Sequence, residues 1–264
     1  MHKIRLGILD LSPRKKNGTD AEAIHETIEV AIAADRLGYN RIWVSEHHNH
    51  EGLSNTSPEL LMCRIAGMTS KIHVGSGGIL LPNFSPLKVA EWIRTLVVFF
   101  PERIDIGIGR STGGDPVTAQ LLNPGYSIDN KSFEDAFTLL NDFLSDRSSI
   151  YFDAKAIAAH PRVLTKPDVW ILSSGAESAA LASKLGVPFS FAHFINPEQS
   201  LGILSQNQES NYNPKTNLAV MTVCAETEEE ATALCLTMQY ALFQIERRAA
   251  DILLSKCIIT NRKQ

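Results

Sequence analysis

Strand-like and helix-like patterns alternate along almost the whole chain of 264 residues. A parallel pair of strands needs a crossover of about a dozen residues or more, so regular alternation of this kind favours a parallel sheet. The strand patterns are short and continuously apolar, which is typical of strands covered on both faces. They lie at residues 4–9, 41–45, 72–75, 103–108, 169–172, 189–192 and 217–225.

Helix patterns fill most of the intervals between these strands. Thr19 and Glu22 form a capping-box sequence before a helix whose apolar residues recur at helical spacing up to Gly38. Ser57-Pro58 and Ser85-Pro86 each predict an N-cap followed by proline at the first helical position. We expect helices near residues 58–70, 86–99, 131–145, 176–185 and 227–254, a long loop over 112–130, and irregular chain over 146–167.

Two architectures fit this order of elements. One is a β/α barrel and the other is an open, doubly wound sheet. The chain shows seven strand patterns, whereas a closed barrel of this kind has eight βα units. The length allows one large α/β domain or two small ones, and a single fold of this size buries roughly three quarters of its unfolded surface.

Composition argues against several classes of function. Lys and Arg number 25 against 29 Asp and Glu, without a basic stripe, which argues against nucleic acid as a partner. The longest apolar stretch, near residues 96–101, is far shorter than a membrane span. Four scattered cysteines indicate reduced thiols rather than a disulfide framework or a zinc site. The first residues form a strand pattern rather than a signal peptide, so we expect a cytoplasmic protein.

Small, polar and titratable residues follow four consecutive strand patterns. In both architectures ligands bind at the carboxyl ends of the parallel strands. We therefore expect the functional site to be formed by residues 45–50, 75–78, 109–114 and 173–176.

Glu46, His47, His48 and His50 form the densest titratable cluster in the sequence. Adjacent side chains of a strand point to opposite faces, so only one of His47 and His48 can face the barrel axis, which argues against a metal site. Two other interpretations are favoured over the metal site. The histidines have no chemical role, or one of them is a catalytic or ligand-orienting group supported by Glu46, which we favour.

Ser173, Ser174 and Gly175 precede a helix pattern and can hold a phosphate, because backbone N–H groups and the helix dipole favour an anion there. Arg110 could contact the same phosphate. The alternatives are an ordinary N-cap for the serines and a surface ion pair for the arginine. The glycine-rich segments 74–78 and 107–113 lack the spacing and the following helix of a dinucleotide-binding motif. Their glycines more simply let a flat ring approach the backbone.

Several of these segments together carry a family resemblance. They are Trp-Val-Ser-Glu-His-His at 43–48, Val-Gly-Ser-Gly-Gly-Ile-Leu-Leu-Pro at 74–82, Ser-Pro-Leu-Lys-Val-Ala-Glu at 85–91, Arg-Ile-Asp-Ile-Gly-Ile-Gly-Arg at 103–110 and Trp-Ile-Leu-Ser-Ser-Gly at 170–175. In this order the chain resembles the bacterial luciferase-like flavin monooxygenase family from about residue 4 to 240. The resemblance implies a TIM-like (β/α)8 barrel, one domain over residues 1–264, that binds FMN noncovalently at its carboxyl-terminal face.

The resemblance also implies roles for individual residues. His47 corresponds to the family's catalytic histidine, with Glu46 beside it. Ser76, Gly77 and Gly78 correspond to the segment behind the isoalloxazine ring, where the family often has a non-prolyl cis peptide. The family's phosphate contacts correspond to Arg110, Ser174, Gly175 and Ser178.

The implied reaction is a monooxygenation. Reduced FMN from a separate flavin reductase reacts with O₂ to give a C4a-peroxyflavin, which oxygenates a small organic substrate. His47 would assist proton transfer or hold the peroxide, which suits a side chain that titrates near neutrality. Two alternatives share the fold: a hydride-transfer enzyme that uses the deazaflavin F420, and a non-catalytic flavin-binding or partner subunit.

The sequence departs from the family at its end. Relatives usually continue past the helix after the seventh strand into an eighth strand and helix, whereas here residue 264 follows only a short apolar segment at 257–259. We therefore expect a barrel that is truncated or irregular at its eighth βα unit. We also expect a homo- or heterodimer, because an interface would cover the apolar residues left exposed.

Overall fold

The computed structural model describes residues 4–125, 130–146, 151–152, 155–209, 215–236 and 239–240. The chain divides into two compact units, Met1–Ala219 and Val220–Gln264. In the second unit residues 228–236 are helical, and Thr227 Oγ1 accepts a hydrogen bond from Glu230 N at 3.2 Å, as the predicted cap requires. The predicted continuation of this helix beyond 240 and the apolar segment 257–259 lie outside the described residues. The single domain over 1–264 stays a prediction.

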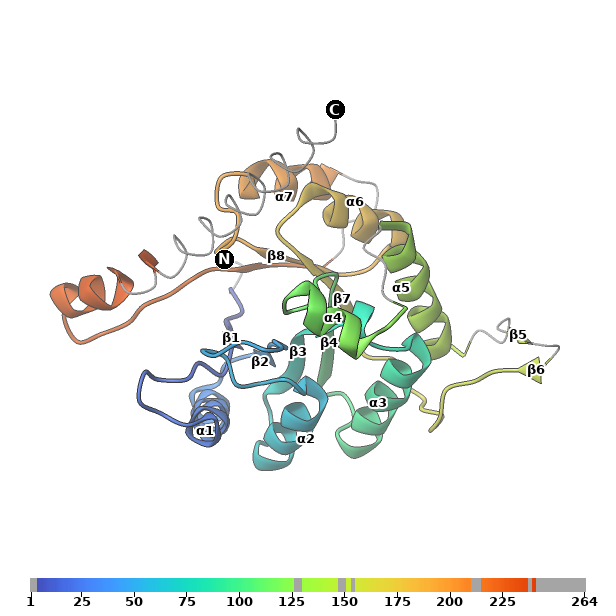
Figure 1. The fold of residues 1–264 in the computed structure, drawn as a ribbon, viewed down its shortest axis with the longest axis horizontal. Coiled ribbons are helices and arrows are strands. Elements are labelled where there is room, and N and C mark those ends of the chain that lie inside the picture. Colours follow the sequence, from blue (N-terminus) through green and yellow to red (C-terminus); the bar gives the residue numbers. More distant parts are fainter. Residues whose placement is uncertain are drawn as a thin grey trace. The chain divides into compact units, whose positions relative to one another are not determined.

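The first unit is built on a sheet of seven parallel strands that follow one another in sequence order (Figure 1). The strands are β1 (Gly7–Asp10), β2 (Arg41–Val44), β3 (His73–Leu80), β4 (Ile104–Gly109), β7 (Val169–Ser173), β8 (Phe189–Ala192) and β9 (Thr216–Ala219). A doubly wound sheet reverses its strand order at a switch point, whereas a barrel does not. The order therefore decides between the two architectures in favour of the TIM-like barrel.

A contact between two tryptophans shows how strongly the sheet is curved. Trp43 of β2 and Trp170 of β7 lie three strands apart in the sheet, which would be about 14 Å in a flat sheet. Their ring centroids are 5.5 Å apart. The sheet must therefore curl so that both side chains meet inside it. In the described part of the chain β1 and β9 are the two ends of this nearly closed barrel.

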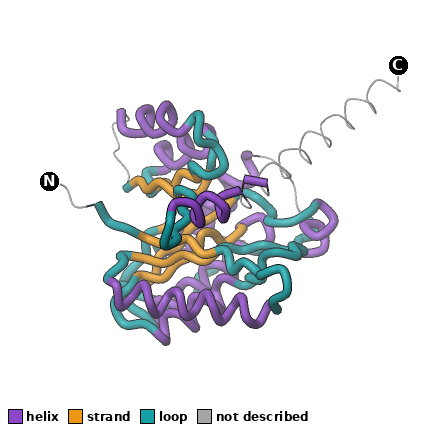
Figure 2. The backbone as a smooth tube through the Cα atoms, turned by 90° about the vertical axis from the view of Figure 1, so that its left-hand side faces the viewer, coloured by secondary structure: helices purple, strands orange, loops and turns teal. Residues whose placement is uncertain are grey.

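Helices alternate with the strands and surround them (Figures 1 and 2). They are α1 (Asp20–Leu37), α2 (Pro58–Met68), α3 (Pro86–Phe99), α5 (Asn130–Leu144), α6 (Ala176–Leu185) and α7 (Ser200–Glu209). The predicted capping box of α1 is confirmed, because Thr19 Oγ1 accepts from Glu22 N and Thr19 N donates to Glu22 Oε2. Gly38 ends this helix with φ of 78°, a left-handed conformation that glycine adopts without strain. Ser57 and Ser85 are N-cap residues as predicted, although neither side chain makes a capping hydrogen bond.

The structure corrects four predictions about elements. The expected loop over 112–130 contains α4 (Pro116–Leu122), which forms because Asp115 accepts hydrogen bonds from Val117 N and Thr118 N. The expected irregular segment over 146–167 contains a small hairpin of β5 (Tyr151–Phe152) and β6 (Lys155–Ala156), and the last strand ends at Ala219 instead of residue 225. The first strand begins at Gly7, where its pairing with Arg41 of β2 starts, and not at Ile4, which is 83% exposed. The helix α7 was not predicted.

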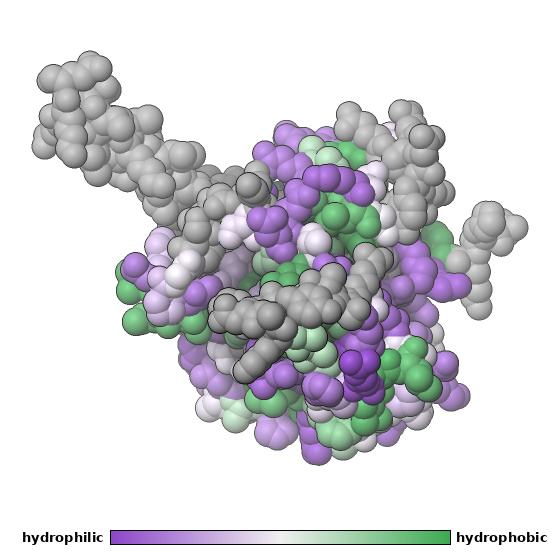
Figure 3. Space-filling view, turned by 90° about the vertical axis from the view of Figure 1, so that its right-hand side faces the viewer, coloured by the Kyte–Doolittle hydropathy of each residue, from purple (hydrophilic) through white to green (hydrophobic). Residues whose placement is uncertain are grey.

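The hydrophobic core lies between the barrel strands and the helices. Ile42, Val74 and Ile106 from the strands belong to the same buried cluster as Ile65 of α2 and Ile93 of α3. On the face shown in Figure 3, hydrophobic residues are scattered among hydrophilic ones. No helix in the described part of the chain is long and apolar enough to cross a membrane.

Candidate active site

The predicted site segments follow β2, β3, β4 and β7, which are neighbours in the sheet. Their register is parallel throughout, so their carboxyl ends open on the same face of the barrel. The structure therefore brings the four predicted segments to one mouth of the barrel.

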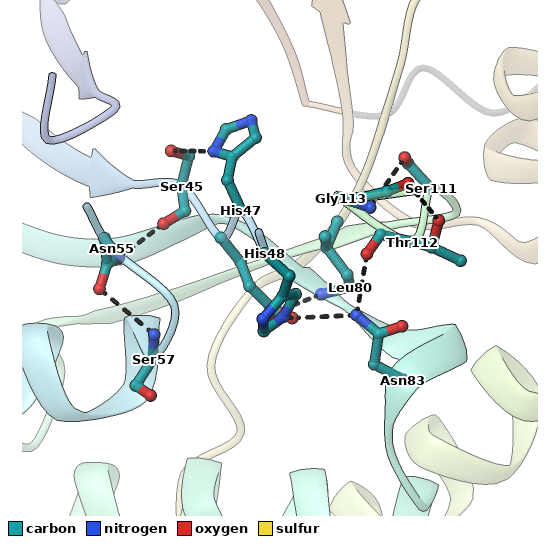
Figure 4. A network of polar contacts seen from close by, with 12 residues as sticks. Ser45, His47, His48, Asn55, Ser57, Leu80, Asn83, Ser111, Thr112 and Gly113 are labelled. Carbon is teal, nitrogen blue, oxygen red and sulfur yellow. Dashed lines mark hydrogen bonds and ion pairs between the residues drawn. The ribbon is translucent and has the colours of Figure 1, made fainter. Parts of the chain in front are cut away.

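His47 lies in the segment after β2, and its Nδ1 atom is 3.1 Å from the hydroxyl of Ser45 (Figure 4). Its backbone N–H donates to the carbonyl of Asn55 at 3.0 Å. Burial, together with the nearby imidazoles of His50 and His48, lowers the pKa of His47 to about 4. The imidazole is therefore neutral at neutral pH, and the expectation that it titrates near neutrality is wrong for this structure.

The side chain of Glu46 points to the opposite side from His47 and supports His48 instead. Its buried carboxylate accepts hydrogen bonds from His48 Nε2 at 2.7 Å, Leu80 N at 3.0 Å and Asn83 Nδ2 at 3.2 Å. Figure 4 shows His48 on the side of Leu80 and Asn83, and His47 on the opposite side. The separation expected for adjacent residues of a strand is thus present, but the partner of Glu46 is His48 and not His47.

The glycines of β3 lie against neighbouring side chains. The Gly77–Gly78 peptide bond is cis, as the resemblance implies. A Cβ atom on Gly77 would collide with Leu9 Cδ1, and one on Gly78 would lie 2.7 Å from the carbonyl oxygen of Gly107. Close packing inside the barrel therefore already requires glycine here, whether or not a flat ring approaches.

Ser76 is placed differently from the other predicted cofactor residues. It is fully buried, and its hydroxyl donates to Gly107 O at 2.8 Å and accepts from Gly107 N at 3.0 Å. Both hydrogen bonds join β3 to β4. The side chain of Ser76 is thus part of the sheet and not of the barrel mouth.

The predicted phosphate-binding residues gather at the start of α6. Gly175 is its N-cap residue and offers no side chain to the first-turn N–H groups. Arg110 lies against this turn, with Nη1 3.2 Å from Glu177 Oε2, and Ser178 is buried in the same turn. The carbonyl of Ser174 accepts from Asn196 Nδ2 at 2.9 Å, which holds the loop in place. Such a helix start, with a guanidinium beside it, is suited to an anion.

Sequence reasoning missed the residues that hold the histidines. Asn55 and Asn83 bond to Ser45, His47 or Glu46 and lie outside every quoted motif, whereas Ser45 lies in the quoted segment 43–48 but was not predicted as the partner of His47. For Ser45 a signal existed, because side chains two residues apart in a strand share a face. In the described residues no group of three His, Cys, Asp or Glu side chains is arranged to hold a metal ion.

The chain is similar to known proteins in sequence and in fold. The family model for luciferase-like monooxygenases matches residues 4–253. The chain belongs to the luciferase-like monooxygenase family. Two curated relatives from Bacillus subtilis are YwcH, 38% identical over 92% of this chain and 75% of its own length, and N-acetyl-S-alkylcysteine monooxygenase, 34% identical over 86% of this chain and 70% of its own.

Three solved structures share the fold. The crystal structure of apo-MsnO8 superimposes with a TM-score of 0.81 at 35% identity, over 87% of this chain and 70% of that one. The oxygenating constituent of 3,6-diketocamphane monooxygenase from Pseudomonas putida was solved with FMN. It has a TM-score of 0.73 at 19% identity, over 92% of this chain and 76% of that one. The F420-dependent tetrahydromethanopterin reductase of Methanopyrus kandleri has a TM-score of 0.67 at 16% identity, over 87% of this chain and 69% of that one. The last two show the likeness of the fold alone.

Proposed function

We propose that this chain is an FMN-dependent monooxygenase that uses reduced FMN and O₂ to oxygenate a small organic substrate. One observation carries the proposal: the imidazole of His47, neutral at neutral pH, and a helix start with the guanidinium of Arg110 beside it belong to the same mouth of the barrel. A cofactor with a flat ring and a phosphate could span these two features. Membership of the family supports the same assignment.

The phosphate of FMN fits the first turn of α6. The first N–H groups of a helix have no acceptor within the helix, and Gly175 supplies none from a side chain. Arg110 is already beside this turn through Glu177, and a dianionic phosphate would attract its guanidinium more strongly than one carboxylate does. We assign Ser174 and Ser178 to the same phosphate as further hydrogen-bond donors.

We place the isoalloxazine ring against the Gly77–Gly78 backbone. Leu9 and Trp43 lie beside Gly77, and Leu172 lies beside Gly78, so the inside of the barrel offers an apolar surface to a flat ring. When bound, reduced FMN supplies the electrons that activate O₂. The role of His47 is to present a ring nitrogen to the reacting oxygen without carrying a positive charge at neutral pH.

Anaerobic titration of the purified protein tests the cofactor. We expect reduced FMN to bind at micromolar concentration and reduced riboflavin, which lacks the phosphate, to bind at least about tenfold more weakly. Arg110→Ala should weaken FMN binding and leave riboflavin binding unchanged, whereas the control Arg64→Ala, on the exposed side of α2, should change neither. Tighter binding of F420 would favour the hydride-transfer alternative, and the absence of any flavin binding would contradict the proposal.

Oxygenation is tested separately from binding. The name of the 34%-identical relative suggests N-acetyl-S-alkylcysteines as the first substrates to try. Product formation with chemically reduced FMN would support the monooxygenase, while FMN binding without any oxygen reaction would favour the non-catalytic subunit. We also propose a separate flavin reductase as the source of reduced FMN, in line with the family.

The expected homo- or heterodimer stays a prediction. Leu60 and Met68 of α2 and Val98 and Phe99 of α3 are large apolar side chains that are 45–68% exposed. An interface over these helices would remove them from water. Light scattering of the purified chain measures its mass in solution and tests this directly.

A further inference from the structure

Ser45 and His47 form a pair at the end of β2. They lie two residues apart, so their side chains share one side of the chain, and Ser45 Oγ is 3.1 Å from His47 Nδ1 (Figure 4). Glu46 and His48 form the alternate pair on the other side. Each histidine therefore has its own orienting partner, and only the Ser45 pair includes the histidine that the proposed function uses.

The backbone holds this pair in place from both sides. The N–H of Ser45 donates to Asp10 O at 3.1 Å, and its carbonyl accepts from Asn55 Nδ2 at 2.6 Å. The carbonyl of Asn55 in turn accepts from the N–H of His47 at 3.0 Å. Buried Asn55 therefore holds the backbone of both residues, from which the hydroxyl and the imidazole extend on the same side.

The direction of the Ser45–His47 hydrogen bond follows from burial. Ser45 is 3% exposed, and a buried hydroxyl proton without an acceptor is unfavourable. Among the described residues, His47 Nδ1 is the only hydrogen-bond partner of the Ser45 hydroxyl. A neutral imidazole carries one proton, on either Nδ1 or Nε2. If the hydroxyl donates to Nδ1, the proton of the ring must be on Nε2.

We propose that Ser45 is a positioning residue: its hydroxyl donates to Nδ1 of His47, holds the imidazole in the Nε2–H tautomer and fixes the direction of that N–H. In the reaction proposed above, His47 then acts first as a hydrogen-bond donor to the reacting oxygen and not as a base. This consequence rests on the proposed function. The tautomer itself is a property of the chain without cofactor.

The tautomer is measured in the cofactor-free protein by NMR, with ¹⁵N-labelled histidine and with the His47 signals assigned from their loss in His47→Gln. At pH 7 we expect a protonated Nε2 and an unprotonated Nδ1. A protonated Nδ1 in the wild type would overturn the proposal, whether or not the protein binds FMN. This readout needs no variant of Ser45, so a folding defect cannot obscure it.

Variants of Ser45 test the positioning. Ser45→Ala should mix the two tautomers and slow the reaction of the reduced FMN complex with O₂ about ten- to a hundredfold, with less than about a twofold change in the Kd of FMN. Ser45→Thr keeps the hydroxyl, so it should retain most of the Nε2–H tautomer and most of the wild-type rate with O₂. Ser57→Ala is the matched control, since that hydroxyl makes no capping hydrogen bond. An unchanged tautomer and rate in folded Ser45→Ala would contradict the proposal.

Discussion

Glu46 Oε1 lies 2.7 Å from Nε2 of His48, and the same buried carboxylate accepts hydrogen bonds from Leu80 N and Asn83 Nδ2. Three elements therefore meet at one side chain: the segment after β2, the end of β3, and the short 3₁₀ helix Leu81–Asn83 that follows it. Asn83 also donates to Thr112 O, which adds the loop after β4. The carboxylate joins the loops of the barrel mouth.

We predict that Glu46→Gln destabilises the protein. The amide group keeps the size of the side chain but can accept hydrogen bonds on one atom only, so at least one buried donor loses its partner. The expected loss of unfolding free energy is about 1–3 kcal/mol. Urea denaturation measures it, with Glu51→Gln in the exposed part of the next loop as the control. A midpoint equal to that of the control would show that the carboxylate does not join the loops.

The pKa of His47 leads to a second prediction. Burial lowers this pKa to about 4, whereas the unfolded chain titrates near 6.5. Between these two values the unfolded state binds more protons than the folded state, so acidification through this range favours unfolding. Stability should therefore fall as the pH drops from about 6.5 toward 4, and His47→Gln should make this dependence shallower.

NMR titration of the cofactor-free protein checks this prediction directly. The His47 ring signals should move with a midpoint near pH 4. A midpoint near 6.5, the value of a histidine in water, would mean that the imidazole is not buried as described.

Arg94 carries a third prediction, far from the barrel mouth. This fully buried residue of α3 donates to Phe143 O, Ala159 O and Asp146 Oδ1, so it joins the end of α5 to the segment before β7. Arg94→Met leaves the buried carbonyls of Phe143 and Ala159 without this donor and should lower the unfolding free energy by about 1–3 kcal/mol for each. Arg64→Met on the exposed face of α2 is the control. Equal thermal midpoints for the two variants would contradict the account of Arg94.

The fold could be predicted from the sequence where the signals are local. Thr19 and Glu22 mark the start of α1 and Gly38 marks its end, each through contacts with residues close in sequence. The structure confirms both ends. The apolar runs predicted the parallel strands for the same reason. The helix α4 was missed because its only start signal is Asp115 before Pro116, inside a segment whose glycines and asparagines are typical of loops.

The candidate site could be predicted only in part, because its contacts are distant in sequence. The position of His47 after a strand was visible, and so was the opposite direction of His48. The hydrogen bond between Glu46 and Asn83 could not be predicted, because the two residues are 37 apart in sequence and meet only when β2 and β3 pair. The pairing of Arg110 with Glu177 spans 67 residues and depends on β4 lying next to β7.

We propose that His47 serves the oxygen reaction of a bound reduced flavin and is not needed to bind the flavin. The most direct test compares wild type and His47→Ala for the Kd of reduced FMN and for the incorporation of labelled oxygen from O₂ into an N-acetyl-S-alkylcysteine, with His25→Ala on α1 as the control. We predict that His47→Ala binds reduced FMN within about a factor of two of the wild type and loses incorporation by about a hundredfold or more. Equal incorporation by wild type and His47→Ala would contradict the account.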